Sequence, residues 1–152
     1  MKPNVLFLCT GNSCRSQMAE GFLRAFRGET YDAFSAGTRP SRVNPLAIEA
    51  MREVGIDISG HRSKNAADYL GRHFAYVITV CDNAKEACPI FPGPCIREHW
   101  PFEDPADATG TDEEKLKVFR KVRDQIGARI RQFLAEQESA GTKSETRSTQ
   151  LP

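Results

Sequence analysis

The sequence predicts an α/β protein, a single three-layer domain in which a four-stranded parallel sheet is flanked by helices. Short apolar runs of strand length, such as residues 5–9 and 75–81, alternate along the chain with segments of helical periodicity. These runs are nearly continuous, as expected of strands that are buried on both faces. A chain of 152 residues suits one such domain, with right-handed crossovers between the strands.

The first half of the chain predicts two strand–helix pairs. The strand at residues 5–9 leads through a loop into a helix that begins close to Arg15 and ends at Gly28. The apolar face of this helix consists of Met18, Ala19, Phe22, Leu23 and Phe26. A short strand follows at residues 31–35. Asn44 then caps a second helix, which has Pro45 in its first turn and stops at Gly55.

The second half predicts two further strands and a long helix. A short helix near residues 66–70 precedes the strand at 75–81, and residues 96–100 form the last strand. Thr111 and Glu114 have capping-box spacing at the start of the long helix. Residues 136–152 are polar, so we expect a domain at residues 1–135 followed by a mobile C-terminal tail.

Composition argues against several classes of partner. The chain has 21 basic and 20 acidic residues, so no overall field favours nucleic acid or an anionic membrane. No apolar run approaches the roughly 18 residues of a membrane span, and the N-terminus lacks a signal-peptide pattern. An odd number of cysteines, five, is typical of reduced thiols. We therefore expect a cytoplasmic protein with no nucleic-acid or membrane partner. A monomer is the default expectation, although nothing in the composition addresses the oligomeric state.

Residues 9–16, Cys-Thr-Gly-Asn-Ser-Cys-Arg-Ser, form the most informative motif. Gly11 and Asn12 tolerate a positive φ and Ser13 can cap, so successive backbone amides can converge on one point at a helix N-terminus. Such a loop binds an oxyanion. The amides, the helix dipole and Arg15 all stabilise a thiolate, which makes Cys9 the candidate nucleophile. The planar guanidinium of Arg15 matches two oxygens of a tetrahedral oxyanion.

The leaving oxygen of such an anion needs a proton donor, because oxygen departs poorly unless it is protonated. Asp104, in the loop before Pro105, is the predicted acid, with Glu103 and Asp107 as weaker substitutes. The alternative is an ordinary turn aspartate. A lone loop histidine, His61, is expected to be a hydrogen-bonded structural residue.

Cys81 and Cys88 form a second cysteine pair after the third strand. A phosphatase needs no further thiols, whereas a reductase needs two electrons and a way to pass the resulting disulfide to solvent. A helix starting at Asp82 would favour a Cys81 thiolate able to attack the sulfur of Cys9. Seven helical residues rise about 10.5 Å, which exceeds the reach of a disulfide, so the segment must unwind to join Cys81 and Cys88.

The remaining cysteines carry weaker signals. Cysteines at positions 81, 88 and 95 could bind a metal, but they lack the short spacing of a structural zinc site. Cys14 and Cys95 are therefore expected to be bystanders in the relay.

Residues 9–21, the pair of Cys81 and Cys88, and the stretch from His99-Trp100 to Asp104-Pro105-Ala106 resemble the thioredoxin-coupled arsenate reductases. That family shares the fold of the low-molecular-weight tyrosine phosphatases. The resemblance runs from about residue 4 to residue 133. It implies that arsenate is the substrate and that thioredoxin, or else glutaredoxin or a low-molecular-weight thiol, is the external reductant.

The resemblance also implies a relay of three thiols. Cys9 attacks arsenate while Asp104 protonates the leaving oxygen, Cys81 then attacks Cys9 and releases arsenite, and Cys88 takes over Cys81 to leave a disulfide for thioredoxin. The oxygens of arsenate are held by loop residues Thr10, Gly11, Asn12, Ser13, Cys14, Arg15 and Ser16.

Some family members bind potassium near this loop through residues that match Asn12, Glu20 and Ser35, together with an aspartate. Lys64 stands where that aspartate would be, and its ammonium can take the place of the cation. We therefore expect these four residues to support the loop, with no metal and no cofactor apart from the external thiol.

Two other functions remain open at this stage. One is a low-molecular-weight protein tyrosine phosphatase, because phosphate and arsenate share charge and shape. Against it, Gln17 stands where those phosphatases usually have proline, and Asp104-Pro105 is followed by Ala-Asp instead of tyrosines. The other is a non-catalytic redox or arsenite-binding sensor that uses Cys9, Cys81 and Cys88.

Overall fold

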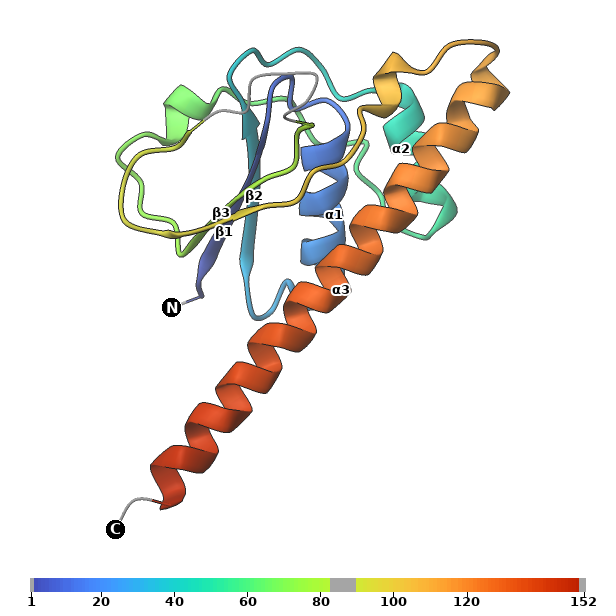
Figure 1. Ribbon diagram of the computed structural model, residues 1–152. Coiled ribbons are helices and arrows are strands. Elements are labelled where there is room, and N and C mark those ends of the chain that lie inside the picture. The colour runs from blue at the N-terminus through green and yellow to red at the C-terminus, as the bar shows by residue number, and fades with distance from the viewer. Residues whose placement is uncertain (1, 83–89, 151–152) are drawn as a thin grey trace.

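The computed structural model describes residues 2–82 and 90–150, with the side chains of the last helix described up to residue 139. Four strands form the sheet: β1 (Asn4–Cys9), β2 (Asp32–Gly37), β3 (Tyr76–Thr79) and β4 (Ile96–His99). They lie in the order β2-β1-β3-β4, and every pair is parallel (Figure 1). The predicted single domain with a four-stranded parallel sheet is confirmed, and each strand lies within two residues of its predicted start.

Three helices cover one side of the sheet: α1 (Arg15–Arg27), α2 (Pro45–Glu53) and α3 (Asp112–Gln150) (Figure 1). Alternation along β1 sends Val5, Phe7 and Cys9 into the core beneath them. Leu6 and Leu8 pack into a second cluster on the other face. Both faces of β1 are buried from Val5 to Cys9, which agrees with the unbroken apolar sequence of these residues.

The second face differs from the prediction of flanking helices. Among the described residues, it is covered by the short 3₁₀ helix η1 (Ala66–Tyr69) and by loops instead of long helices (Figure 1). Aromatic rings do the packing there: Phe74 meets both Phe34 and Phe91 edge-on, with ring centroids 5.6 and 5.7 Å apart. Aromatic side chains bury large areas, which lets loops close a face that helices would otherwise cover.

The predicted helix starts are confirmed. Asn44 caps α2 by accepting a hydrogen bond from the Leu46 amide at 2.8 Å. Thr111 and Glu114 form the reciprocal capping box of α3, with N···O distances of 3.2 and 3.3 Å. A second 3₁₀ helix, η2 (Pro105–Asp107), lies just before α3.

The long helix does not end where the polar segment begins. α3 continues to Gln150 and projects from the domain (Figure 1). The mobility expected of residues 136–152 stays a prediction. Two contacts hold the continuation of α3 to the body: the Tyr76 hydroxyl donates to Gln137 at 2.8 Å, and Arg27 pairs with Glu138 at 3.1 Å. The segment also has no proline before residue 152 that would stop a helix.

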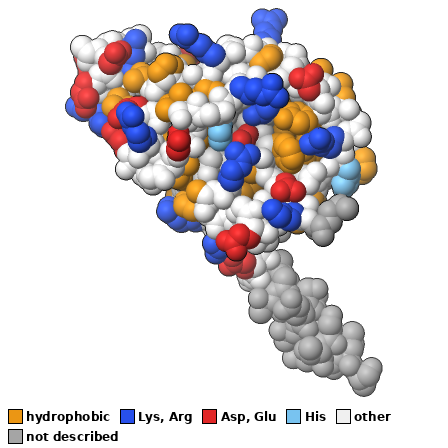
Figure 2. All heavy atoms as spheres, turned by 180° about the vertical axis from the view of Figure 1, so that it is seen from behind, with side chains coloured by type: hydrophobic (Ala, Val, Ile, Leu, Met, Phe, Trp, Pro, Cys, Tyr) orange, Lys and Arg blue, Asp and Glu red, His pale blue; other side chains and the backbone are white. Residues whose placement is uncertain are grey.

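Basic and acidic side chains are interspersed on the face that Figure 2 shows, in keeping with a net charge of +1. Within the described part of the chain, no helix is both long enough and apolar enough to cross a bilayer.

Gly37 is expected to be intolerant of any side chain, because β2 ends against the loop that follows β1. A Cβ at this position would lie against the Thr10 carbonyl oxygen and 2.9 Å from the Asn12 nitrogen. Gly37→Ala should therefore lower the free energy of unfolding by about 1–3 kcal/mol. The matched control is Gly60→Ala, where no atom lies within 4 Å of the added carbon. Urea unfolding of both variants measures the difference, and equal stabilities would contradict the close packing.

Candidate active site

Cys9 is the last residue of β1, and the loop of residues 10–14 curls around its sulfur before α1 begins. Its side chain is 2% exposed. The Asn12 amide donates to Cys9 Sγ at 3.2 Å, and the Ser16 hydroxyl lies 2.9 Å from the same sulfur. One backbone amide and one hydroxyl thus face the sulfur.

The loop of residues 10–14 forms a cup around Cys9, and its carbonyls are held on the outer side of this cup. Arg39, Ser41 and Asn44 donate their backbone amides to the carbonyls of Thr10, Gly11 and Ser13 at 2.9, 3.1 and 3.0 Å. In a trans peptide the carbonyl and the following N–H point in opposite directions. Binding the Gly11 carbonyl outside therefore turns the Asn12 N–H inward, which is the donor that meets the sulfur.

Asn12 adopts the left-handed conformation that this turn requires, with φ of 49°. The loop before η1 holds it there: the Lys64 backbone amide donates to Asn12 Oδ1 at 2.9 Å, and the Ser63 side-chain hydroxyl donates to the Asn12 carbonyl at 2.6 Å. Ser63 is a supporting residue that the sequence analysis missed. Nothing local marks it, because its partner lies 51 positions away.

Arg15 and Asp104 meet across the mouth of the cup. Arg15 is 3% exposed, and its Nη1 donates to the Phe102 carbonyl at 3.1 Å. Its Nη2 lies 3.6 Å from Asp104 Oδ2. The other oxygen of Asp104 accepts from the Ala106 amide at 3.0 Å, which fixes the direction of the carboxylate. The loop before η2 thus brings the predicted acid to the predicted anion site.

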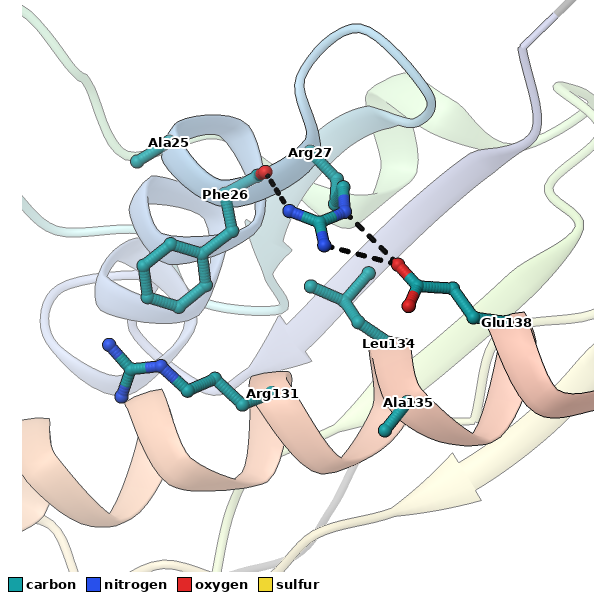
Figure 3. Close-up of a pocket in the computed structure, with 7 residues that line it drawn as sticks. All are labelled: Ala25, Phe26, Arg27, Arg131, Leu134, Ala135 and Glu138. Carbon is teal, nitrogen blue, oxygen red and sulfur yellow. Dashed lines mark hydrogen bonds and ion pairs between the residues drawn. The ribbon is translucent and has the colours of Figure 1, made fainter.

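These side chains line a cavity of about 220 Å³, formed by Cys9, Thr10, Gly11, Ser13, Cys14, Arg15, Asp104 and Ala106. A larger hollow of about 520 Å³ lies between α1 and α3 (Figure 3). Phe26 and Leu134 face it, and the ion pair of Arg27 with Glu138 closes one side. None of the side chains that line this hollow is a nucleophile, so the smaller cavity is the candidate active site.

Behind the cup, the four residues predicted to support the loop come together. Glu20 is 3% exposed, and it accepts from the Ser35 hydroxyl at 2.6 Å. The Lys64 ammonium lies 3.4 Å from both Glu20 Oε1 and Ser35 Oγ, and its backbone amide reaches Asn12. Lys64 therefore places a positive charge among the oxygens and ties that cluster to the loop.

The thiols differ in their state and surroundings. Cys81 is fully buried and disulfide-bonded, whereas Cys9, Cys14 and Cys95 are free. The Val80 amide donates to the Leu8 carbonyl at 3.0 Å, so β1 and β3 deliver Cys9 and Cys81 to the same edge of the sheet. Both belong to one buried cluster. Cys88, and the helix expected after Asp82, lie outside the described residues.

Cys14 is expected to be inert despite lying close to Cys9, the predicted nucleophile. Burial, opposed by a hydrogen bond with Ser13, raises the pKa of its thiol to about 12. At pH 8 only about one molecule in 10⁴ then carries a Cys14 thiolate, the form that reacts. Iodoacetamide should leave Cys14 unmodified in the folded protein and label it after unfolding in guanidinium. Mass spectrometry of the peptides checks this, and rapid labelling in the folded state would contradict it.

Lys64→Leu should destabilise the protein, since it leaves the buried Glu20 carboxylate without one of its positive neighbours. We expect the free energy of unfolding to fall by about 1–3 kcal/mol. Arg62→Gln is the matched control, because it removes the same charge from an exposed neighbouring side chain. Urea unfolding measures both, and an unchanged Lys64→Leu variant would show that the ammonium does not support the cluster.

Known proteins are similar to this chain in sequence and in fold. Residues 4–145 match the model of the family described as low molecular weight phosphotyrosine protein phosphatase. The arsenate reductase of Halalkalibacterium halodurans is 51% identical over 132 residues, which cover 87% of this chain and 95% of that protein.

Two solved structures agree with this. An arsenate reductase in its phosphate-binding state has a TM-score of 0.73 at 39% identity, over 90% of this chain and 98% of that one. A thioredoxin-dependent arsenate reductase of Corynebacterium glutamicum has a TM-score of 0.64 at 28% identity, over 91% of this chain and 63% of that one. The chain therefore belongs to the low molecular weight phosphotyrosine protein phosphatase family, and the resemblance to its arsenate reductases that the motifs indicated is confirmed.

Proposed function

We propose that the protein reduces arsenate to arsenite with electrons from thioredoxin. The observation that carries this proposal is a nucleophile in an anion cup at the same sheet edge as a second cysteine that is already disulfide-bonded. A hydrolase of phosphate esters needs the cup but not the second thiol. The relatives named arsenate reductase support the same substrate.

The reaction begins with arsenate in the cavity, its oxygens bound by the loop amides and by Arg15. The Cys9 thiolate attacks arsenic, a sulfur–arsenic bond forms, and Asp104 gives its proton to the oxygen that leaves as water. Cys81 as a thiolate then attacks the sulfur of Cys9. The electron pair of the sulfur–arsenic bond passes to arsenic, which leaves as arsenite, and a disulfide joins Cys9 to Cys81.

Two exchanges return the enzyme to its starting state. Cys88 attacks Cys81, which frees Cys9 as a thiolate and moves the disulfide to Cys81 and Cys88. Reduced thioredoxin then supplies two electrons to this disulfide. The Cys81 and Cys88 thiols are restored, and thioredoxin leaves with a disulfide of its own. Over the whole cycle, one arsenate and one dithiol become arsenite, water and one disulfide. We place the reaction in the cytoplasm, where such thiols are kept reduced.

A second candidate activity is hydrolysis of aryl phosphates. The anion cup, Arg15 and Asp104 are sufficient for it, and the family is named for this reaction. We expect it as a slow side reaction, since Ala106 follows the acid loop where a phosphotyrosine pocket would need aromatic walls.

The test is arsenate-dependent oxidation of NADPH in the presence of thioredoxin and thioredoxin reductase. Cys9→Ser should lower turnover of arsenate by more than about 10³-fold, because the hydroxyl is a far weaker nucleophile. Cys81→Ser and Cys88→Ser should each stop multiple turnover but leave hydrolysis of p-nitrophenyl phosphate intact. Loss of both activities in the Cys81 variant would contradict the division of roles, and a protein that only binds arsenite would show neither.

Asp104→Asn should slow the first step by about 10²–10⁴-fold, since the amide cannot protonate the leaving oxygen. Single-turnover release of arsenite at pH 7 measures this step without thioredoxin. Glu103→Gln is the control, because Glu103 does not line the cavity. Equal rates in the two variants would assign the acid elsewhere. Turnover of arsenate measured with glutaredoxin or glutathione in place of thioredoxin shows which class of reductant the protein uses.

A further inference from the structure

Gln17 is fully buried in the first turn of α1, and both ends of its side-chain amide are bonded. The nitrogen lies 2.8 Å from the Arg62 carbonyl, 3.0 Å from Asn12 Oδ1 and 3.2 Å from the Asn12 carbonyl. All three partners only accept, so the NH₂ group must face them. The oxygen of the amide therefore faces the other way, where it lies 3.0 Å from Nδ1 of His61.

This orientation determines the protonation of His61. The Gln17 oxygen can only accept, so Nδ1 of His61 must carry a hydrogen. On the other side of the ring, Nε2 lies 3.1 Å from Nη1 of Arg24, and a guanidinium can only donate. Nε2 therefore accepts, and His61 is neutral with its proton on Nδ1.

The charged groups around His61 agree with a neutral ring. Burial lowers the pKa of His61, and Arg24 and Lys64 act in the same direction, opposed by Glu20 and Asp57. Glu20 Oε2 lies 3.5 Å from Nδ1, which further favours a hydrogen on that nitrogen.

The same polarity continues to the nucleophile. With its oxygen bonded to Gln17, the Asn12 side chain presents Nδ2 to Ser16 Oγ at 2.8 Å. The Ser16 hydroxyl accepts that bond and has one hydrogen to donate, and a thiolate at Cys9 Sγ, 2.9 Å away, can only accept it. Four consecutive hydrogen bonds thus run in one direction, from His61 through Gln17, Asn12 and Ser16 to the sulfur of Cys9.

We infer that Gln17, oriented by His61, is a positioning residue that aims the Ser16 hydroxyl at the Cys9 thiolate. A reversed amide at either Gln17 or Asn12 would offer Ser16 an acceptor, and its hydrogen would then turn away from the sulfur. The inference rests on the proposed nucleophile but not on arsenate as the substrate. It also gives a function to the residue that occupies the position where phosphatases of this family usually have proline.

The experiment follows the rate of Cys9 alkylation by iodoacetamide against pH, with the modified peptide quantified by mass spectrometry. Gln17→Met keeps the size of the side chain and removes all four bonds. The pH of half-maximal alkylation should rise by about 0.5–1 unit, because a donor to the thiolate is no longer aimed. In the proposed reaction, kcat should fall about tenfold with little change in KM for arsenate.

Leu23→Val is the matched control, since it loosens the same helix at a fully buried position that no bond of this series touches. If Leu23→Val only destabilises the core, its half-maximal alkylation of Cys9 should occur at the same pH as in the wild type. An unshifted profile for Gln17→Met, or an equal shift for Leu23→Val, would overturn the inference.

His61 provides a second test if Gln17→Met fails to fold, because His61 is only partly buried. An asparagine amide nitrogen can occupy the position of Nδ1, so His61→Asn should keep the wild-type profile, whereas His61→Leu should shift it upward as Gln17→Met does. Identical profiles for these two variants would contradict a directional role. Retained turnover in Cys9→Ser would instead overturn the proposed function, so the two failures are distinguishable.

Discussion

The proposed chemistry of this protein depends on the orientation of one peptide unit, between Gly11 and Asn12. Its carbonyl is bonded outside the loop by Ser41, and its N–H meets the sulfur of Cys9 inside. This arrangement requires the left-handed backbone at Asn12, which costs free energy in any residue except glycine. The surrounding contacts exist to hold that conformation, and without it the strand end, the cup and the helix dipole would not act on one point.

A buried charge cluster supplies much of this support. Glu20 would be costly to bury alone, but Lys64, Arg24 and Ser35 surround its carboxylate. Since the Lys64 amide also bonds Asn12, the cluster and the loop are coupled through one residue. The ion pairs of Glu20 thereby help to fix the geometry of the loop around Cys9, the proposed nucleophile.

Parallel pairing explains why sulfur chemistry could be added to an anion site in this fold. The ends of β1 and β3 lie side by side, so a cysteine placed just after each strand reaches the same edge. Cys81 is both fully buried and disulfide-bonded, and it lies in the core cluster that also contains Cys9. A reductase can therefore use the phosphatase framework with changes confined to the loops beyond the strands.

The sequence by itself determined the parallel sheet, the helix starts and the anion loop, because apolar runs, capping residues and a Cys-x₅-Arg motif are local signals. Tertiary structure decided what holds that loop. Gln17 meets His61 across 44 positions, and Arg15 meets the Phe102 carbonyl across 87, and such bonds between distant loops have no periodic signature. The continuation of α3 past residue 135 was likewise decided by the fold, because the residues that contact it, Tyr76 and Arg27, come from other elements.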